Sequence, residues 1–175
     1  MTELIEVNLT ELNQLFNSLD PSPFHERDLD HDAEEFIVSW AQEHSHKHDL
    51  KLVVHLAKHP VDVADAQKLV ANSIAHYFDY RAEMTLREFK RLMREGRASF
   101  LIGLLFLGSC QFAATLLTPA DGNWQSVARE GLTIIGWVAM WKPLEIYLYR
   151  WWPLLALIKL YQRLSRMPVE VHCSA

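Results

Sequence analysis

Two short stretches in the first half of the chain alternate between apolar and polar residues. Leu4–Leu9 and Leu50–Leu56 both follow this pattern. Alternation with a period of two predicts β-strands with one buried face. Two strands alone form a marginal sheet. We therefore expect either helices that cover it completely or strands from another chain that pair with it.

Apolar residues at three- and four-residue spacing predict three helices around these strands. Asn8-x-x-Glu11 resembles a capping box and predicts a short helix just after it. A longer helix is predicted from about Asp28 to His44. A third opens after Pro60, and its pattern continues without a Ser/Gly-rich hinge into the most apolar part of the chain. Residues 1–96 are therefore expected to form a small α+β domain.

The most apolar part of the chain begins at Ala98 and continues to Ala120, 23 residues without a charge. Ten of these residues are Leu, Ile or Phe, and each favours insertion by about 0.3–0.6 kcal/mol. Because about 20 helical residues cross a hydrocarbon core, we expect a transmembrane helix over residues 98–118. The alternative is a buried core helix, which is usually shorter and carries a polar stripe.

A Pro/Asp/Gly/Asn turn and a second apolar run follow, and Lys142, Glu145 and Arg150 interrupt this run. A lysine at mid-bilayer costs about 2.5–3.5 kcal/mol. That cost largely disappears if the second span covers residues 124–142, because Lys142 then reaches the interface and Pro143 ends or kinks the helix. Residues 97–150 are therefore expected to form a two-span hairpin.

Basic and aromatic side chains predict how this hairpin lies in the membrane. Tryptophans at interfaces act as anchors, and we assign that role to Trp124, Trp141, Trp151 and Trp152. Lys and Arg gather before the first span and after the second, at Arg87, Lys90, Arg91, Arg94, Arg97, Lys142, Arg150, Lys159, Arg163 and Arg166. The positive-inside rule then predicts a multi-pass protein with both termini in the cytoplasm.

Residues 151–175 are expected to form an amphipathic helix and a tail. Between Pro153 and Arg166 the polar residues share one face, at Lys159, Gln162, Arg163 and Arg166. One interpretation is a helix lying in the membrane interface, its basic face toward anionic headgroups. The other is a helix that covers the cytosolic domain. Amphipathicity alone does not choose between them.

Charge divides the chain at the same place as hydropathy. Residues 1–96 carry 18 acidic and 10 basic side chains, and residues 97–175 carry 4 and 7. An acidic first part excludes a strongly basic nucleic-acid binder, so no nucleic-acid partner is expected. The opening residues also lack the basic and apolar regions of a signal peptide, so we expect residues 1–96 to stay on the side where they are made.

Motifs typical of catalysis are missing from the sequence. GxxxxGK[ST], GxGxxG, HExxH and GxSxG do not occur, and Cys110 and Cys173 form no CxxC. We therefore expect no enzyme activity and no cofactor. His44, His46 and His48 alternate in a polar segment and can bind zinc, nickel or copper weakly. Nothing supplies a closed second shell of ligands, which favours a solvated loop.

Polar and small residues within the two spans are the remaining candidates. Lys142 and Glu145 are three residues apart, so they can pair on one helix face at the membrane boundary. With Gln111 they would line a polar path if several copies surrounded one. Small residues let helices approach closely, and they lie at Gly108, Ser109 and Ala113 in the first span and at Gly136 and Ala139 in the second.

Two segments of the chain are distinctive, DPSPFHERDLDHDAEEFI (residues 20–37) and the Trp-rich EGLTIIGWVAMWKPLEIYLYRWWP (residues 130–153). With both in place, the chain resembles a family of small bacterial inner-membrane proteins that have an N-terminal cytosolic segment and a two-helix membrane hairpin. The resemblance implies this topology and a bacterial inner-membrane location, and it implies no catalytic residue.

These patterns together predict a non-enzymatic membrane protein that acts by assembly, either with copies of itself or with another membrane protein. The first alternative is an oligomeric channel or transporter for ions or small solutes, lined by Gln111, Lys142 and Glu145. A weaker alternative is metal handling through the three histidines at 44, 46 and 48. The lipid bilayer is the one partner that the composition predicts directly.

Overall fold

The computed structural model describes residues 2–17, 28–43, 49–57, 63–117 and 123–173. It divides into two compact units. The first contains residues 1–85 and 156–175, and the second contains residues 86–155. The division differs from the expected boundaries at 96/97 and 150/151, because the C-terminal residues return to the unit that the N-terminal residues begin.

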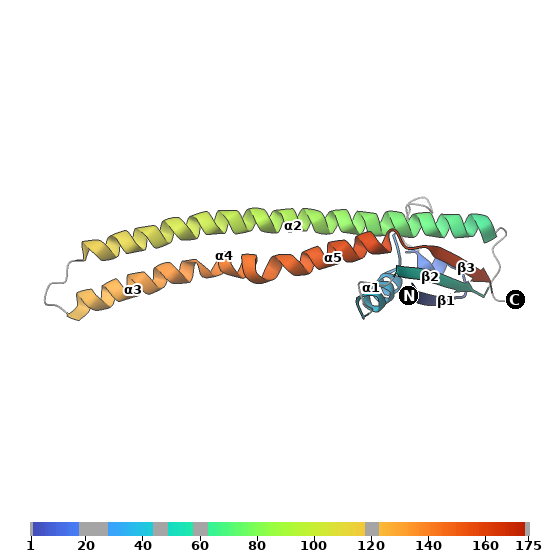
Figure 1. Ribbon diagram of the computed structural model, residues 1–175, viewed down its shortest axis with the longest axis horizontal. Coiled ribbons are helices and arrows are strands. Elements are labelled where there is room, and N and C mark those ends of the chain that lie inside the picture. Colours follow the sequence, from blue (N-terminus) through green and yellow to red (C-terminus); the bar gives the residue numbers. More distant parts are fainter. Residues whose placement is uncertain (1, 18–27, 44–48, 58–62, 118–122, 174–175) are drawn as a thin grey trace. The chain divides into compact units, whose positions relative to one another are not determined.

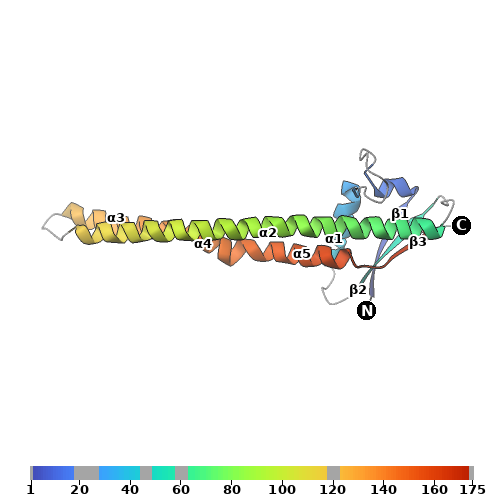
Figure 2. The same cartoon turned by 90° about the horizontal axis from the view of Figure 1, so that it is seen from above.

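The first unit is built on a three-stranded parallel sheet in the order β1-β2-β3 (Figure 2). The two strands expected from the sequence are confirmed as β1, Thr2–Leu9, and β2, Asp49–Leu56. The sequence interpretation missed the third strand, β3, Val169–Cys173, which pairs with β2 from Leu52↔Val169 to Leu56↔Cys173. The chain therefore supplies its own third strand, and the argument that the sheet needs strands from another chain loses its premise.

Helices at the start of the first unit are shorter than the sequence predicts. The expected helix after Asn8 is only a 3₁₀ turn, η1, Leu12–Leu15, and Gln14 rather than Asn8 caps it by accepting the backbone N–H of Thr10 at 2.8 Å. The next helix is confirmed as α1, His31–Glu43. It begins where the side chain of Asp30 accepts the backbone N–H of Asp32 at 3.1 Å.

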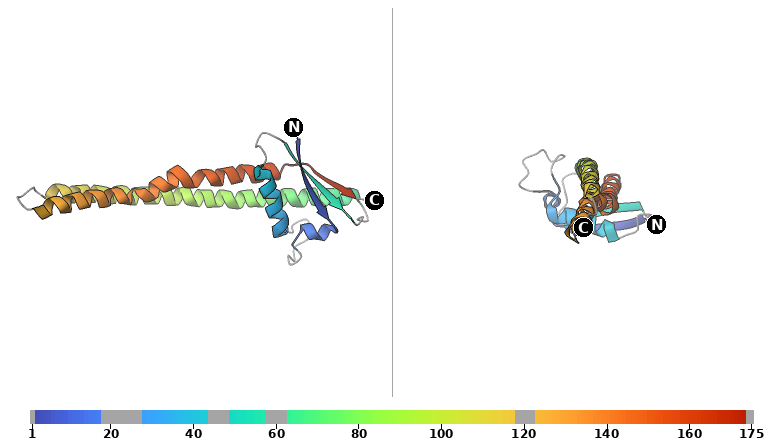
Figure 3. Two further views of the ribbon diagram at one scale, coloured as in Figure 1. Left: turned by 90° about the horizontal axis from the view of Figure 1, so that it is seen from below. Right: turned by 90° about the vertical axis from the view of Figure 1, so that its left-hand side faces the viewer.

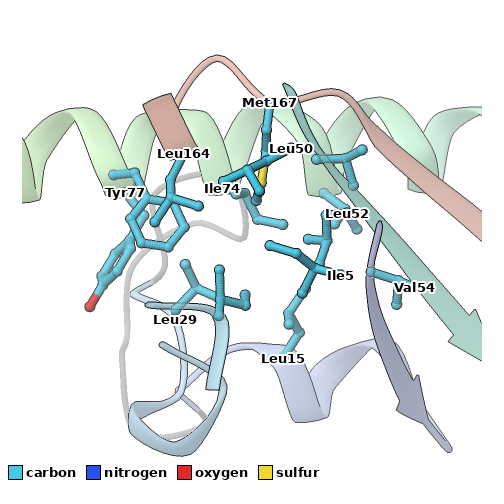
Figure 4. Packing of buried hydrophobic residues seen from close by; sticks show 14 of the residues in the cluster. Ile5, Leu15, Leu29, Leu50, Leu52, Val54, Ile74, Tyr77, Leu164 and Met167 are labelled. Atoms are coloured by element: carbon cyan, nitrogen blue, oxygen red, sulfur yellow. The ribbon is translucent and has the colours of Figure 1, made fainter. Parts of the chain in front are cut away.

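One helix, α2, runs without interruption over Val63–Leu116, as the missing hinge predicts. Its residues up to Thr85 belong to the first unit, where α1 runs across α2 rather than along it (Figure 3). The core between these helices and the sheet is made of aliphatic and aromatic side chains (Figure 4). Fully buried members come from β1, η1, α1, β2, α2 and α5, and include Ile5, Leu15, Ile37, Leu52, Val54, Ile74, Phe78 and Leu164.

The last helix, α5, Trp151–Leu164, decides between the two interpretations of residues 153–166. Its apolar residues Leu160, Tyr161 and Leu164 are buried in the core of the first unit. The structure therefore has the second alternative, a helix that covers the α+β unit, and it continues into β3 rather than into an unstructured tail. Tertiary packing uses the same amphipathic face that a membrane interface would use.

The second unit is a pair of antiparallel arms. One arm is α2 from residue 86 onward, and the other contains α3, Asn123–Ala139, α4, Trp141–Glu145, and the π-helix η3, Ile146–Arg150 (Figure 1). The helix expected over residues 124–142 corresponds to α3, which ends three residues earlier than predicted. Pro143 has no backbone N–H to donate to the carbonyl of Ala139, and α3 ends at Ala139.

A second proline accounts for the π-helix. Pro153 cannot donate to the carbonyl of Tyr149, four residues earlier. The hydrogen-bonding pattern widens to a π turn over Ile146–Arg150, directly before the helical turn that contains this proline. The returning arm thus bends at two prolines, while the outgoing arm is continuous.

Candidate functional site

The two arms of the second unit meet along a seam of small residues. A Cβ atom added to Gly136 would lie 2.9 Å from Cδ1 of Leu107, and one added to Gly103 would lie 3.0 Å from the carbonyl oxygen of Ala139. One added to Gly96 would lie 3.0 Å from a methyl carbon of Ile146. Only glycine permits such close approach of helix backbones. The seam includes the break before Pro143, where the carbonyl of Ala139 packs against Gly103.

Outside this seam, many exposed side chains of the unit are large and apolar, whereas exposed charged residues lie at 87–97, 129–130 and 142–150. Residues exposed by at least 60% include Leu101, Ile102, Leu105, Phe112, Leu116, Trp124, Val127, Ile134, Trp137, Val138, Trp141, Tyr149 and Trp152. Large exposed apolar surfaces mark sites of contact with membranes or with other proteins. By length and composition, α2 over Gln67–Leu116 can cross a membrane, with an 18-residue window of mean hydropathy 1.7. The glycine seam is therefore the interior of a helix pair whose outer surface carries many exposed apolar side chains.

The predicted small residues divide between the seam and the outer surface. Gly136 is buried in the seam, and the Ala139 carbonyl contributes to it. Ser109 is exposed and donates its hydroxyl to the carbonyl of Phe106 at 2.8 Å, and Ala113 is half-buried. A Cβ added to Gly108 would meet nothing within 4 Å. The sequence pattern missed Gly96 and Gly103, whose seven-residue spacing is the signal of a helix-packing stripe.

Gln111 lies on the outer surface of the unit, close to Gly108. The two residues are three positions apart, so they share one face of α2. The side chain of Gln111 is exposed, and in the described part of the chain its amide makes no hydrogen bond. An unpaired amide is costly in hydrocarbon, which makes this residue a candidate contact for another helix.

The predicted pair of Lys142 and Glu145 is not formed. The Nζ atom of Lys142 lies 3.5 Å from Oε1 of Glu95 on the opposite arm. Over the residues with described positions, Glu145 makes no ion pair. Gln111 is sixteen residues beyond Glu95 on α2, about 24 Å along the helix axis. One copy of the unit therefore does not bring the three predicted path-lining residues together.

The four predicted anchor tryptophans are all at the surface. Trp124 lies near the start of α3, and Trp141 begins α4. Trp151 is the least exposed, at 36%, and its indole N–H donates to the carbonyl of Tyr147 at 2.7 Å, while Trp152 is 60% exposed. Trp141, Trp151 and Trp152 lie with Tyr149 within a few residues of the π-helix, whereas Trp124 lies at the other end of the returning arm. Aromatic residues of this kind mark the headgroup level of membrane proteins.

The first unit contains a buried polar network that sequence reasoning missed. Glu34 on α1 has a side chain only 12% exposed, and its Oε1 lies 2.7 Å from Nη2 of Arg81. Its Oε2 accepts the hydroxyl of Tyr77 at 2.6 Å. The same Arg81 lies over the ring of Tyr161, 5.6 Å from the ring centroid. The network thus joins α1, α2 and α5.

Burial and charge shift the titration of this network. Burial raises the pKa of Tyr77 well above its ordinary value, and the hydrogen bond to Glu34 raises it further. Burial lowers the pKa of Arg81, but the Glu34 carboxylate, Tyr161 and Tyr77 together outweigh that effect, and the pKa is raised. The i, i+4 spacing of Tyr77 and Arg81 was a readable signal of a shared face. No sequence pattern predicted that Glu34 contacts these two residues.

The outer face of the sheet carries a second polar cluster. Nζ of Lys51 lies 2.7 Å from Oε1 of Glu170, and this hydrogen bond holds the pKa of Glu170 below its ordinary value. His55 and His172 are register neighbours with ring centroids 5.7 Å apart. His55 is also 3.9 Å from Glu6. Within the described ranges, no group of three or more His, Cys, Asp or Glu side chains is arranged to hold a metal ion.

The remaining predicted site falls outside this description. His44, His46 and His48 lie outside the described residues, as does the expected turn at 118–122. Metal binding by these histidines therefore stays a prediction. Comparisons with protein-family models, with curated proteins and with solved structures found no match to the chain. The site is consequently interpreted from its own geometry.

Proposed function

We propose that the chain is an integral protein of a bacterial inner membrane that acts by assembly through its hairpin and has no catalytic activity. The carrying observation is the contrast within residues 86–155 between a glycine seam and an exterior of exposed Leu, Ile, Phe and Trp side chains. Lipid is the solvent that makes such an exterior favourable, because helices in lipid associate through small residues rather than through apolar burial.

The first unit supports two crossings rather than one. Residues 1–85 and 156–175 contribute to a single core, with Ile5 and Leu164 both fully buried in it. A core cannot be shared across a bilayer, so the chain between these parts must return to the side from which it left. Residues 86–155 therefore cross twice, and the lysine and arginine clusters at both ends support the cytoplasm as that side.

The outward-facing Gly108 and Gln111 support assembly. Gly108 has no neighbour within 4 Å of a built Cβ, so a second helix can approach its backbone closely. One turn away, the unpaired amide of Gln111 can then hydrogen-bond across the interface. Two copies related by a two-fold axis would bring their Gln111 side chains together, and a hydrogen bond of this kind contributes about 0.6–2 kcal/mol.

Three measurements test the proposal with the full chain. Alkaline extraction of membranes should leave the protein in the membrane pellet, and a reporter fused at the C-terminus should be active only in the cytoplasm. Light scattering in mild detergent should give a mass of two or more copies. A single-copy mass with no co-purifying protein would overturn assembly, and a periplasmic C-terminus would overturn the two-span hairpin.

Point variants distinguish a specific helix interface from non-specific association. Gln111→Leu and Gly108→Leu should each weaken self-association by about tenfold, since each removes about 1–2 kcal/mol of helix contact. The matched control is Ile102→Ala, on the opposite face of α2 nine residues before Gln111. Equal weakening by this control would mean that the Gly108 face is not the interface.

A further inference from the structure

A groove lies between α2 and the π-helix region of the second unit. Its volume is about 530 Å³, and it is lined by Glu88, Arg91, Leu92, Glu95, Tyr149, Arg150, Pro153 and Leu154. Leu92, Tyr149, Pro153 and Leu154 form an apolar and aromatic part, and four charged side chains form the rest. The combination of an apolar wall with charges of both signs is the chemistry of a site for an amphiphile.

The two arginines come from opposite arms and lie at the same level. Gly96 packs against Ile146, and Arg91 and Arg150 lie about 6–8 Å along the arms from that contact, in the same direction. Both side chains are exposed. Neither makes an ion pair with any residue whose position is described. Two unpaired guanidinium groups at one mouth are suited to a phosphate, which they bind through paired N–H donors.

The carboxylates of the groove are not equivalent. Oε1 of Glu95 already lies 3.5 Å from Nζ of Lys142 and forms an ion pair with it. Glu88 makes no ion pair within the described part of the chain, so it leaves one negative charge beside the two arginines. A ligand that carries a phosphate and an ammonium group matches this arrangement of charges, whereas a ligand with only negative charge leaves Glu88 unpaired.

The level of the groove indicates a membrane lipid as the source of the phosphate. Arg91 is seven residues before the uncharged run that begins at Ala98, about 10 Å along the helix. The headgroup layer is about 5–8 Å thick on each side of the hydrocarbon core, and arginine side chains extend several ångströms toward it. The exposed aromatic residues Tyr149 and Trp152 lie in the same segment.

We propose that the groove between α2 and the π-helix binds the head group of an aminophospholipid, with Arg91 and Arg150 on the phosphate and Glu88 on the ammonium. The acyl chains would then follow the exposed apolar surface of the arms. Basic pockets between membrane helices on the cytoplasmic side bind lipid head groups in this way. The inference rests on the proposed insertion of the hairpin in a membrane.

The test is native mass spectrometry of the full chain released from detergent, titrated with short-chain phosphatidylethanolamine, phosphatidylglycerol, phosphatidylcholine or inorganic phosphate. Phosphatidylethanolamine adducts should form at the lowest concentration. The double variant Arg91→Gln/Arg150→Gln should weaken this binding about 30-fold, because each arginine contributes about 1 kcal/mol, or about five- to sixfold in affinity. Glu88→Gln should remove the preference for phosphatidylethanolamine over phosphatidylglycerol.

The matched control is Arg94→Gln, an exposed arginine of the same helix that does not line the groove. It should leave lipid binding unchanged. Equal losses in this control and in the double variant would overturn the site, and inorganic phosphate that binds as tightly as lipid would overturn the lipid source. Alkaline extraction of the same variants distinguishes the two proposals. A variant that stays in the membrane but no longer binds lipid would support the groove as the binding site. Release of the unmodified protein from the membrane would contradict the proposed insertion.

Discussion

The buried Glu34–Arg81 contact gives the sharpest prediction about the first unit. Arg81→Met keeps a flexible apolar stem but removes the guanidinium 2.7 Å from the Glu34 carboxylate. Glu34 then remains buried with only the Tyr77 hydroxyl as a described hydrogen-bond donor, 2.6 Å away. We expect the helix α1 that carries Glu34 to open more easily, since its carboxylate can recover solvation only by moving out.

The magnitude follows from the burial of the two partners. Breaking a fully buried ion pair costs about 3–5 kcal/mol because it leaves a buried charge uncompensated. The Glu34 side chain is 12% exposed, but that of Arg81 is 41% exposed. Solvent therefore screens part of the interaction, and we expect a loss of about 1.5–3 kcal/mol. Local opening should become roughly 10- to 100-fold more frequent.

Hydrogen exchange measured by mass spectrometry on the full chain provides the assay. Amides of α1 should exchange faster by that factor in Arg81→Met, while amides of α3 in the second unit serve as an internal reference. The double variant Glu34→Gln/Arg81→Met should exchange more slowly than Arg81→Met alone, because it no longer buries a charge. A double variant that is less protected than either single variant would refute the reasoning.

Three further predictions concern other parts of the chain. Gly136→Leu should destabilise the hairpin by about 1–3 kcal/mol through overpacking. Circular dichroism in detergent should show this as a lower melting temperature. Gly131→Leu should not lower the melting temperature, because a Cβ at this position meets nothing within 4 Å. The pKa of Glu170 is lowered in the folded chain, so its stabilising effect is present above its ordinary pKa and is lost as the pH falls. Protection of β3 amides should therefore fall on acidification, and less so in Lys51→Met; identical pH profiles would contradict this. Residues 1–96 expressed alone should lack cooperative unfolding in urea, because they lack the third strand and the last helix of the core; a sharp transition would show that these elements are dispensable.

Local patterns predicted the elements of this fold better than their partners. The alternation in Leu4–Leu9 and Leu50–Leu56 was sufficient for both strands, and the unbroken apolar periodicity after Pro60 was sufficient for the continuous α2. Val169–Cys173 alternates in the same way, so β3 was readable in principle. What the pattern could not supply was its partner, since β2 lies more than a hundred residues earlier and register across such a distance is set by packing.

The candidate sites show the same limit. Composition and charge predicted an apolar hairpin with Lys142 near its boundary, but the partner of that lysine is Glu95 on the other arm rather than Glu145 on its own. A three-residue spacing makes two side chains neighbours on a straight helix. Here the break before Pro143 and the close approach at Gly96 and Gly103 present the lysine to the opposite arm instead. Pairing across a seam depends on how closely two backbones approach, which no single-helix pattern contains.

The way the chain closes its first core constrains how the proposed hairpin could insert in a membrane. Strand β1 and helix α1 are synthesised before the hairpin, whereas α5 and β3 follow it, and Ile37 and Leu164 end in the same buried cluster. The order β1-β2-β3 makes β2 the central strand, so until β3 arrives this strand has one unpaired edge. If residues 86–155 insert as proposed, the α+β unit is complete only after the returning arm is back on the side where synthesis began. Insertion of residues 86–155 and folding of the acidic unit would then be linked through α5 and β3, whose apolar residues complete the core.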